Sequence, residues 1–148
     1  MPPLLTIAAL LAASPAAAPQ AWTPETIPWQ RTNPDGTRFA LLEGVRDRAG
    51  VPFTYAFSIP GDVWDGPHSH AAMARVVVAK GVLRLGYGGR MDKAGAGVFP
   101  AGSVVIVPAG AVHFDGSDED TIIIGTAIGP WSTDYRDAGA APSAGTPR

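Results

Sequence analysis

The stretch Gly102-Ser-Val-Val-Ile-Val-Pro-Ala-Gly-Ala-Val-His113 joins a β-branched run to a turn and then to a histidine. Its valines and isoleucine predict a strand, and the Pro-Ala-Gly turn delivers His113 at the start of the next strand. Two more histidines stand in Gly66-Pro-His68-Ser-His70, where the one-residue gap places both imidazoles on the same face of an extended strand. Imidazole is the commonest metal ligand among side chains. The sequence therefore predicts that His68, His70 and His113 hold one divalent transition metal and leave at least one coordination position open.

Most of the chain reads as strands separated by turns. Val76 to Val78 and Ile122 to Ile124 are continuous apolar runs, which are typical of strands covered on both faces, as in a double-sheet jelly roll. With 148 residues and 46% hydrophobic content, the chain can enclose one core. We therefore predict an all-β fold with a single domain. The segments rich in β-branched and aromatic residues are 39–43, 53–59, 75–79, 82–87, 103–107 and 121–128.

The composition excludes several classes of function. A net charge of -2, with scattered Lys and Arg residues, offers no basic field for nucleic acid, so no nucleic-acid partner is expected. The chain has no cysteine, which excludes disulfides, thiolate ligands and a cysteine nucleophile. Any metal must therefore be held by nitrogen and oxygen atoms.

The histidines and the glycines around them resemble the two sequence motifs of the cupin superfamily. In the first motif, His68 and His70 match the His-x-His pair and Gly81 matches the glycine that ends it. The resemblance extends over residues 29–136, and outside the motifs it is to small secreted single-domain cupins, in Asn33-Pro-Asp-Gly-Thr, Phe53-Thr-Tyr55 and Gly129-Pro130-Trp131. It implies a double-stranded β-helix, the cupin jelly-roll barrel, around a three-histidine metal site. The second motif is matched by Gly102, Pro108, Gly110 and His113.

The chain departs from the cupin pattern at the position of the glutamate ligand. Counting back from Gly81 places that position at Ala74, so the fourth ligand of many cupins is absent and the neighbouring Arg75 cannot replace it. In the second motif, Ser117 stands where the final asparagine is usual. The loss of the glutamate also clears volume beside the metal for a substrate or a water molecule.

Three neutral imidazoles leave a divalent ion with both of its positive charges, which favours an anionic ligand. Such an ion can polarise a carbonyl, lower the pKa of bound water, or bind an enolate or catecholate together with dioxygen. The expected function is therefore a metal-binding cupin that acts on a small anionic, enolisable or ring-hydroxylated compound, in its enzymatic form a dioxygenase-type oxidoreductase. The alternative is a non-catalytic cupin that binds or senses a small molecule, with or without metal. Histidine ligands do not distinguish Fe, Zn, Ni, Mn and Cu.

Two further side chains are candidates for catalysis. Asp115 follows His113 by two residues and should share its face, where it is a partner that orients a histidine, a general base, or a solvated turn residue. Tyr55 lies on a predicted barrel strand and faces either the pocket or the core. Trp64 and Trp131 are expected to pack at the rim of the barrel.

The two ends of the chain differ from the predicted domain. Residues 1–18 carry no charged side chain and run from an apolar segment into small residues, so residues 1–20 are predicted to be a signal peptide for the periplasm or the medium. An Ala/Pro-rich tail is the alternative, whereas the apolar run is shorter than the ~20 residues that a membrane span needs. Residues 137–148 are expected to form a loose tail. The expected partner is a small, anionic molecule. Both a monomer and a homodimer are compatible with the sequence.

Overall fold

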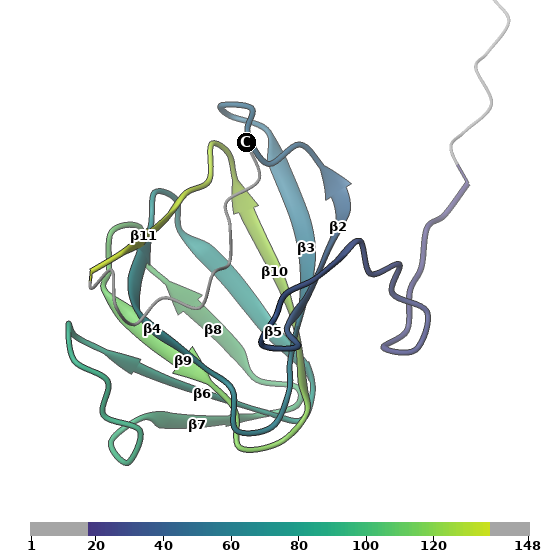
Figure 1. The fold of residues 1–148 in the computed structure, drawn as a ribbon. Coiled ribbons are helices and arrows are strands. Elements are labelled where there is room, and N and C mark those ends of the chain that lie inside the picture. Colours follow the sequence, from purple (N-terminus) through teal and green to yellow (C-terminus); the bar gives the residue numbers. More distant parts are fainter. Residues whose placement is uncertain (1–17, 137–148) are drawn as a thin grey trace, which may run out of the picture.

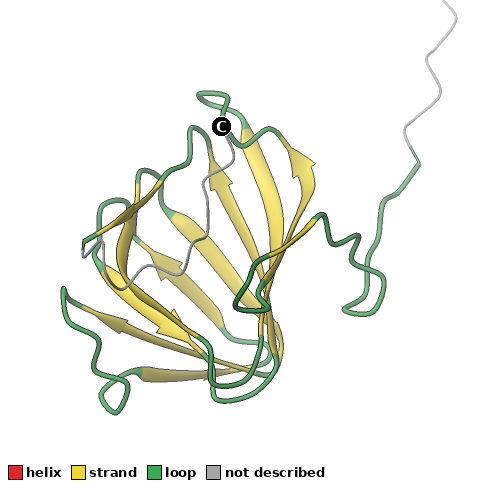
Figure 2. Cartoon of the chain, in the orientation of Figure 1, coloured by secondary structure: helices red, strands yellow, loops and turns green. Residues whose placement is uncertain are grey.

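The computed structural model describes residues 18–136, so the predicted signal peptide, apart from its last residues, and the predicted tail lie outside the described residues. Within this part of the chain every regular element is a strand (Figure 2). No helix among these residues is long and apolar enough to cross a membrane.

The strands form two antiparallel sheets that face each other as the walls of one barrel (Figure 1). This arrangement confirms the predicted all-β cupin jelly roll. The 6-stranded sheet has the order β1 (Arg31–Thr32), β2 (Arg38–Gly44), β3 (Pro52–Ile59), β10 (Thr121–Ile128), β5 (Ala74–Lys80) and β8 (Val104–Val107). The 5-stranded sheet has the order β11 (Thr133–Tyr135), β4 (Trp64–His70), β9 (His113–Gly116), β6 (Val82–Tyr87) and β7 (Gly97–Pro100).

The main core lies between the two sheets and follows the alternation of side chains along each strand. On β5, Ala74, Val76 and Val78 are buried, whereas Val77 is 41% exposed on the outer face. The prediction that the run 76–78 is covered on both faces is therefore wrong, because an antiparallel jelly-roll strand needs only its inner face covered.

The run 122–124 on β10 does have cover on both sides. Ile123 belongs to the core between the sheets, while Ile122 packs in a second cluster with Ile27. Trp29 packs against the same second cluster. The segment before β1 therefore supplies the outer cover that β5 lacks.

The cupin-motif residues outside the histidines have structural roles. Gly81 joins β5 to β6 with a φ of +74°, and a Cβ at this position would lie 2.4 Å from the hydroxyl oxygen of Thr121. Only glycine fits this turn without strain. Ser117, in place of asparagine, is fully buried, and its hydroxyl donates to the Val82 carbonyl at 2.7 Å. These contacts tie the turn before β10 to the start of β6.

Candidate metal centre

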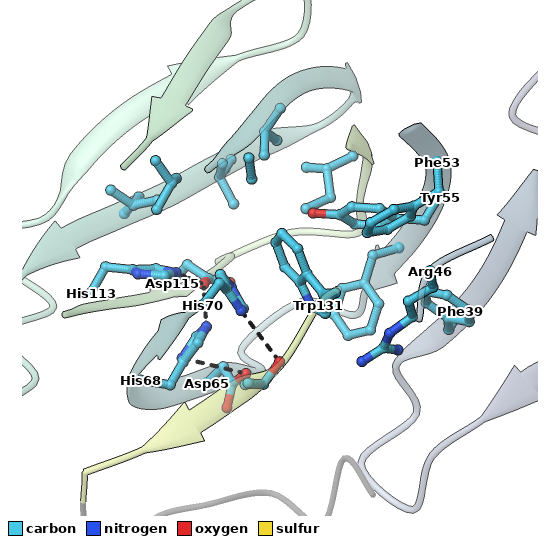
Figure 3. Close-up of a pocket in the computed structure, with 18 of the residues that line it drawn as sticks. Phe39, Arg46, Phe53, Tyr55, Asp65, His68, His70, His113, Asp115 and Trp131 are labelled. Atoms are coloured by element: carbon cyan, nitrogen blue, oxygen red, sulfur yellow. Dashed lines mark hydrogen bonds and ion pairs between the residues drawn. The ribbon is translucent and has the colours of Figure 1, made fainter. Parts of the chain in front are cut away.

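The three histidines meet because β4 and β9 are neighbours in the 5-stranded sheet. His68 lies directly opposite His113 across the two strands, and His70 follows on the same face of β4. One ring nitrogen from each histidine lies within 4.8 Å of the others. His68 and His113 are buried and His70 is partly exposed. Figure 3 shows the three rings gathered at one end of a pocket between the sheets.

Main-chain oxygens anchor the far side of each imidazole ring. The Nδ1 atom of His68 lies 2.7 Å from the Gly66 carbonyl, that of His70 lies 3.1 Å from the Ser132 carbonyl, and that of His113 lies 2.9 Å from the Ala111 carbonyl. A carbonyl only accepts, so each Nδ1 donates its proton. In a neutral ring this leaves the Nε2 atom with a free lone pair. The second atom of each ring thus orients the ligand atom, as in protein metal sites.

Burial keeps the rings of His70 and His113 uncharged. Desolvation, aided by the neighbouring histidines, lowers the pKa of His70 from 6.5 to about 3. Desolvation also lowers the pKa of His113, although the charge of Asp115 opposes the shift. Neutral imidazole is the form that binds metal, so both rings are in the ligand form at neutral pH.

We expect acidification to destabilise the metal-free protein. As the pH falls, His70 takes up a proton near pH 6.5 in the unfolded chain but only near pH 3 in the folded chain. The stability that His70 contributes as a neutral ring is therefore fully present above pH 6.5 and is lost as the pH falls towards 3. Asp65 acts in the opposite sense, because its folded pKa of about 6 gives stability that is lost as the pH rises from 3.8 through 6. The pKa shift of His70 is larger than that of Asp65, and the pKa of His113 is lowered as well. The histidines therefore outweigh Asp65, and the net effect of acidification is a loss of stability.

Urea denaturation of the metal-free protein at pH 7 and pH 5 measures this effect. The free energy of unfolding should be lower at pH 5, and His70→Asn should reduce the difference. A stability that is equal or greater at pH 5 would contradict the expectation.

Two carboxylates border the histidine cluster. The Oδ2 atom of Asp115 lies 3.7 Å from the Nε2 atoms of both His68 and His113, so the prediction that Asp115 shares the face of His113 is confirmed. Asp65 is the cross-strand partner of Asp115, and its Oδ2 atom lies 3.7 Å from the Nδ1 atom of His68. The Tyr135 hydroxyl donates to Asp65 at 3.0 Å. Burial, together with the charge of Asp115, raises the pKa of Asp65 to about 6.

Aromatic side chains form the wall next to the metal centre. Tyr55 is buried and lines the pocket, and burial raises its pKa. Trp131, expected at the rim, instead stacks on His70 with ring centroids 4.2 Å apart and planes 28° apart. The centroid of the Phe53 ring lies 5.9 Å from the ring centroid of Tyr55 and 5.7 Å from that of Trp131. Trp64 lies outside this wall and has Lys93 over its ring.

The pocket also has a basic side, which no pattern in the sequence predicts. Arg31 and Arg46 both line it, and both guanidinium groups lie over the ring of Phe39. The Cζ atom of Arg31 is 5.6 Å from the ring centroid and that of Arg46 is 5.9 Å from it. The Nε atom of Arg46 is buried and has no hydrogen-bond partner among residues 18–136. Burial lowers the pKa of Arg46, and its positive charge contributes to the lowered pKa of His70. In Figure 3 the Trp131 ring stands between His70 and Arg46.

The position of the missing glutamate faces the same cavity. Ala74 lines the pocket together with the three histidines and is 2% exposed, whereas the next residue, Arg75, is exposed. The counting that placed the glutamate position at Ala74 therefore agrees with the structure. The pocket has a small apolar side chain where many cupins have a carboxylate.

Two facing sheets with a buried histidine cluster at the pocket between them define a cupin. The chain belongs to the ChrR cupin-like domain family, which matches residues 18–132. No curated protein matches the chain.

Solved structures agree on the fold. An uncharacterised protein with a double-stranded β-helix domain from Klebsiella pneumoniae is 12% identical, with a TM-score of 0.61 over 80% of this chain and 100% of its own. The polyketide cyclase RemF from Streptomyces resistomycificus is 16% identical, with a TM-score of 0.60 over 76% of this chain and 80% of its own. A chain of the Rhodobacter sphaeroides complex of SigE with the anti-sigma ChrR is 23% identical, with a TM-score of 0.54 over 70% of this chain and 50% of its own.

Proposed function

We propose that this protein binds one divalent transition metal through His68, His70 and His113 and uses it to hold a small anionic, ring-hydroxylated or enolisable compound. The observation that carries the proposal is the pocket itself, which has metal ligands at one end, guanidinium groups on another side and aromatic rings between them. A planar ligand with a chelating group and an acidic group would satisfy all three surfaces.

The histidine cluster fits a metal ion. Each Nδ1 atom is held by a main-chain carbonyl, and the Nε2 lone pairs remain for coordination. Nitrogen donors of this type suit Fe, Zn, Ni, Mn and Cu. A bound ion would supply Lewis acidity, and a redox-active ion would also supply reactivity towards dioxygen.

The side chains around the cluster determine what could bind beside the ion. Tyr55, Phe53 and Trp131 offer flat apolar contact to a ring, and their packing keeps water from that side of the site. The Arg46 guanidinium is partly buried, and among residues 18–136 no carboxylate lies within ion-pair distance of it. A buried cation of this kind is stabilised by an anion, which a ligand carboxylate would provide. The groups in the pocket that could hold or transfer a proton include Asp65, Asp115, Tyr55 and Tyr135.

Metal analysis of the full chain, purified without an affinity tag, is the first test. About one equivalent of a transition metal is expected, and its absence under metal-replete conditions would contradict the proposal. The metal-loaded protein is then titrated with hydroxybenzoates and dihydroxybenzoates and with their neutral amides, while oxygen uptake is recorded. Tighter binding of the acids supports the proposed pocket chemistry, and equal binding of acids and amides contradicts it.

The same experiment decides between an oxidoreductase and a sensing protein. Oxygen uptake with a redox metal supports a dioxygenase-type enzyme. Binding without turnover supports the non-catalytic alternative, which is favoured by the structural likeness to a chain of the complex that contains the anti-sigma ChrR. In both cases the pocket and its metal would serve to recognise a small molecule.

We also propose that the protein is exported to the periplasm or the medium. The proposal rests on the uncharged apolar run at the start of the chain and on the small residues that follow it. Cell fractionation followed by N-terminal sequencing should give a mature chain that begins between Ala16 and Trp22. A cytoplasmic protein with an intact Met1 would contradict it.

A further inference from the structure

We propose that Asp115 is a fourth ligand of the metal and supplies, from β9, the carboxylate that the chain lacks at Ala74 on β5. This inference rests on the proposed three-histidine metal site and adds a ligand to it.

The first argument is the position of the carboxylate. The Asp115 Oδ2 atom lies 3.7 Å from the Nε2 atom of His68 and 3.7 Å from that of His113. Two ligand atoms bonded to one ion at about 2.0–2.2 Å stand roughly 2.8–3.1 Å apart in octahedral geometry and roughly 3.3–3.6 Å apart in tetrahedral geometry. A shift of a few tenths of an ångström therefore reaches the tetrahedral separation, and one of roughly 0.6–0.9 Å the octahedral separation, so Asp115 can enter the coordination shell next to these two histidines.

The second argument is the polarity of the contact. The Nδ1 atoms of His68 and His113 donate to carbonyls, so in the neutral rings both Nε2 atoms present lone pairs towards the carboxylate oxygen. Acceptors then face one another at 3.7 Å with no hydrogen between them. No residue among 18–136 donates a hydrogen bond to the Asp115 carboxylate. A cation bound between these three atoms satisfies all of them.

Asp65 has a different relation to the cluster. Its Oδ2 atom faces the Nδ1 side of His68 and accepts a hydrogen bond from Tyr135. It therefore lies behind the ring, on the side away from the ligand atom. Because Asp65 and Asp115 are cross-strand partners of the same residue type, Asp65 is a matched control for Asp115.

The change of strand has a consequence for the pocket. A carboxylate ligand from Asp115 reduces the charge of the divalent site by one, so preference for an anionic ligand then depends more on Arg46. The wall around Ala74 stays apolar and open to a ligand, which a glutamate at that position would partly fill.

Titration of the metal-free full chain with cobalt(II), in competition with a chelator, tests the assignment. Asp115→Asn should lower the cobalt affinity at least tenfold and change the visible absorption bands of the bound ion, whereas Asp65→Asn should leave the bands in place. Ala74→Glu should restore most of the lost affinity in the Asp115→Asn protein and raise it much less in the wild type, because only one of these proteins lacks a carboxylate ligand. Circular dichroism of each metal-free variant verifies the fold.

The outcomes separate this inference from the proposed metal site. If the wild type binds cobalt and Asp115→Asn binds it with the same affinity and spectrum, Asp115 is not a ligand and the three-histidine site stands alone. If Ala74→Glu raises the affinity equally in both backgrounds, the carboxylate of Asp115 does not contribute to coordination. If the wild type binds no cobalt, the proposed metal site fails and this inference fails with it. Should Asp115→Asn not fold, Asp115→Ser takes its place, because it also removes the carboxylate, and the same loss of cobalt affinity and the same restoration by Ala74→Glu are expected.

Discussion

Replacing His113 with alanine is expected to remove most of the bound metal and to leave the barrel folded. His113 is the one histidine that β9 contributes, and its loss leaves the ion with the two imidazoles of β4 and, under the inference above, the carboxylate of Asp115. The removed ring is buried and its Nδ1 atom donates to the Ala111 carbonyl, so a destabilisation of about 1–4 kcal/mol is expected. That is less than the 5–15 kcal/mol typical of the stability of a whole domain.

Metal content by mass spectrometry and a thermal melt of the same sample measure this prediction. Tyr87→Phe is the control, because Tyr87 lies on the neighbouring strand β6, with its ring centroid 6.4 Å from that of His113, and offers no ligand atom of the histidine type. The control should keep its metal. Full metal occupancy in the His113→Ala protein would show that the ion does not lie between the three histidines.

The longer strands could be predicted because local composition determines them. β-Branched and aromatic runs located β2, β3, β5, β6, β8 and β10 to within one residue at each end. The strands that these runs did not indicate are short or contain residues that weaken the signal. β1 has 2 residues, β11 has 3, and β7 ends in a proline at the edge of its sheet. These strands form through pairing with a neighbour, which composition does not encode.

The histidine cluster could be predicted because its geometry is nearly local. The His-x-His pair needs only the alternation of one strand, and His113 follows a turn whose Pro108 and Gly110 match the second cupin motif. The rest of the pocket depends on strand register. Asp65 meets Asp115 only because β4 pairs with β9, and Tyr135 reaches Asp65 only because β11 pairs with β4. No short-range pattern in the sequence shows either pairing.

The basic side of the pocket depends on a longer-range arrangement still. Arg46 follows β2 along the chain and Trp131 follows β10, yet both line the same cavity. As isolated positions, Arg46 and Arg48 look alike in the sequence, and only the fold makes the first partly buried and the second exposed. This difference allows a sharp test of the proposed ligand class.

Arg46→Gln is expected to weaken binding of an aromatic acid ten- to a hundredfold and to leave binding of its neutral amide nearly unchanged. A hydrogen bond to a charged group contributes about 1.5–3 kcal/mol, and 1.4 kcal/mol corresponds to a factor of ten in affinity. Isothermal titration of the zinc-loaded protein with dihydroxybenzoate and dihydroxybenzamide measures both affinities.

The control is Arg48→Gln, which removes the same charge two residues away, from an exposed side chain outside the pocket. It should change neither affinity by more than about twofold. If Arg46→Gln weakens the acid and the amide equally, the guanidinium supports the shape of the wall and does not bind an anion. Zinc content should be the same in all three proteins, because Arg46 acts on the ligand from the side of the pocket that offers no metal ligand.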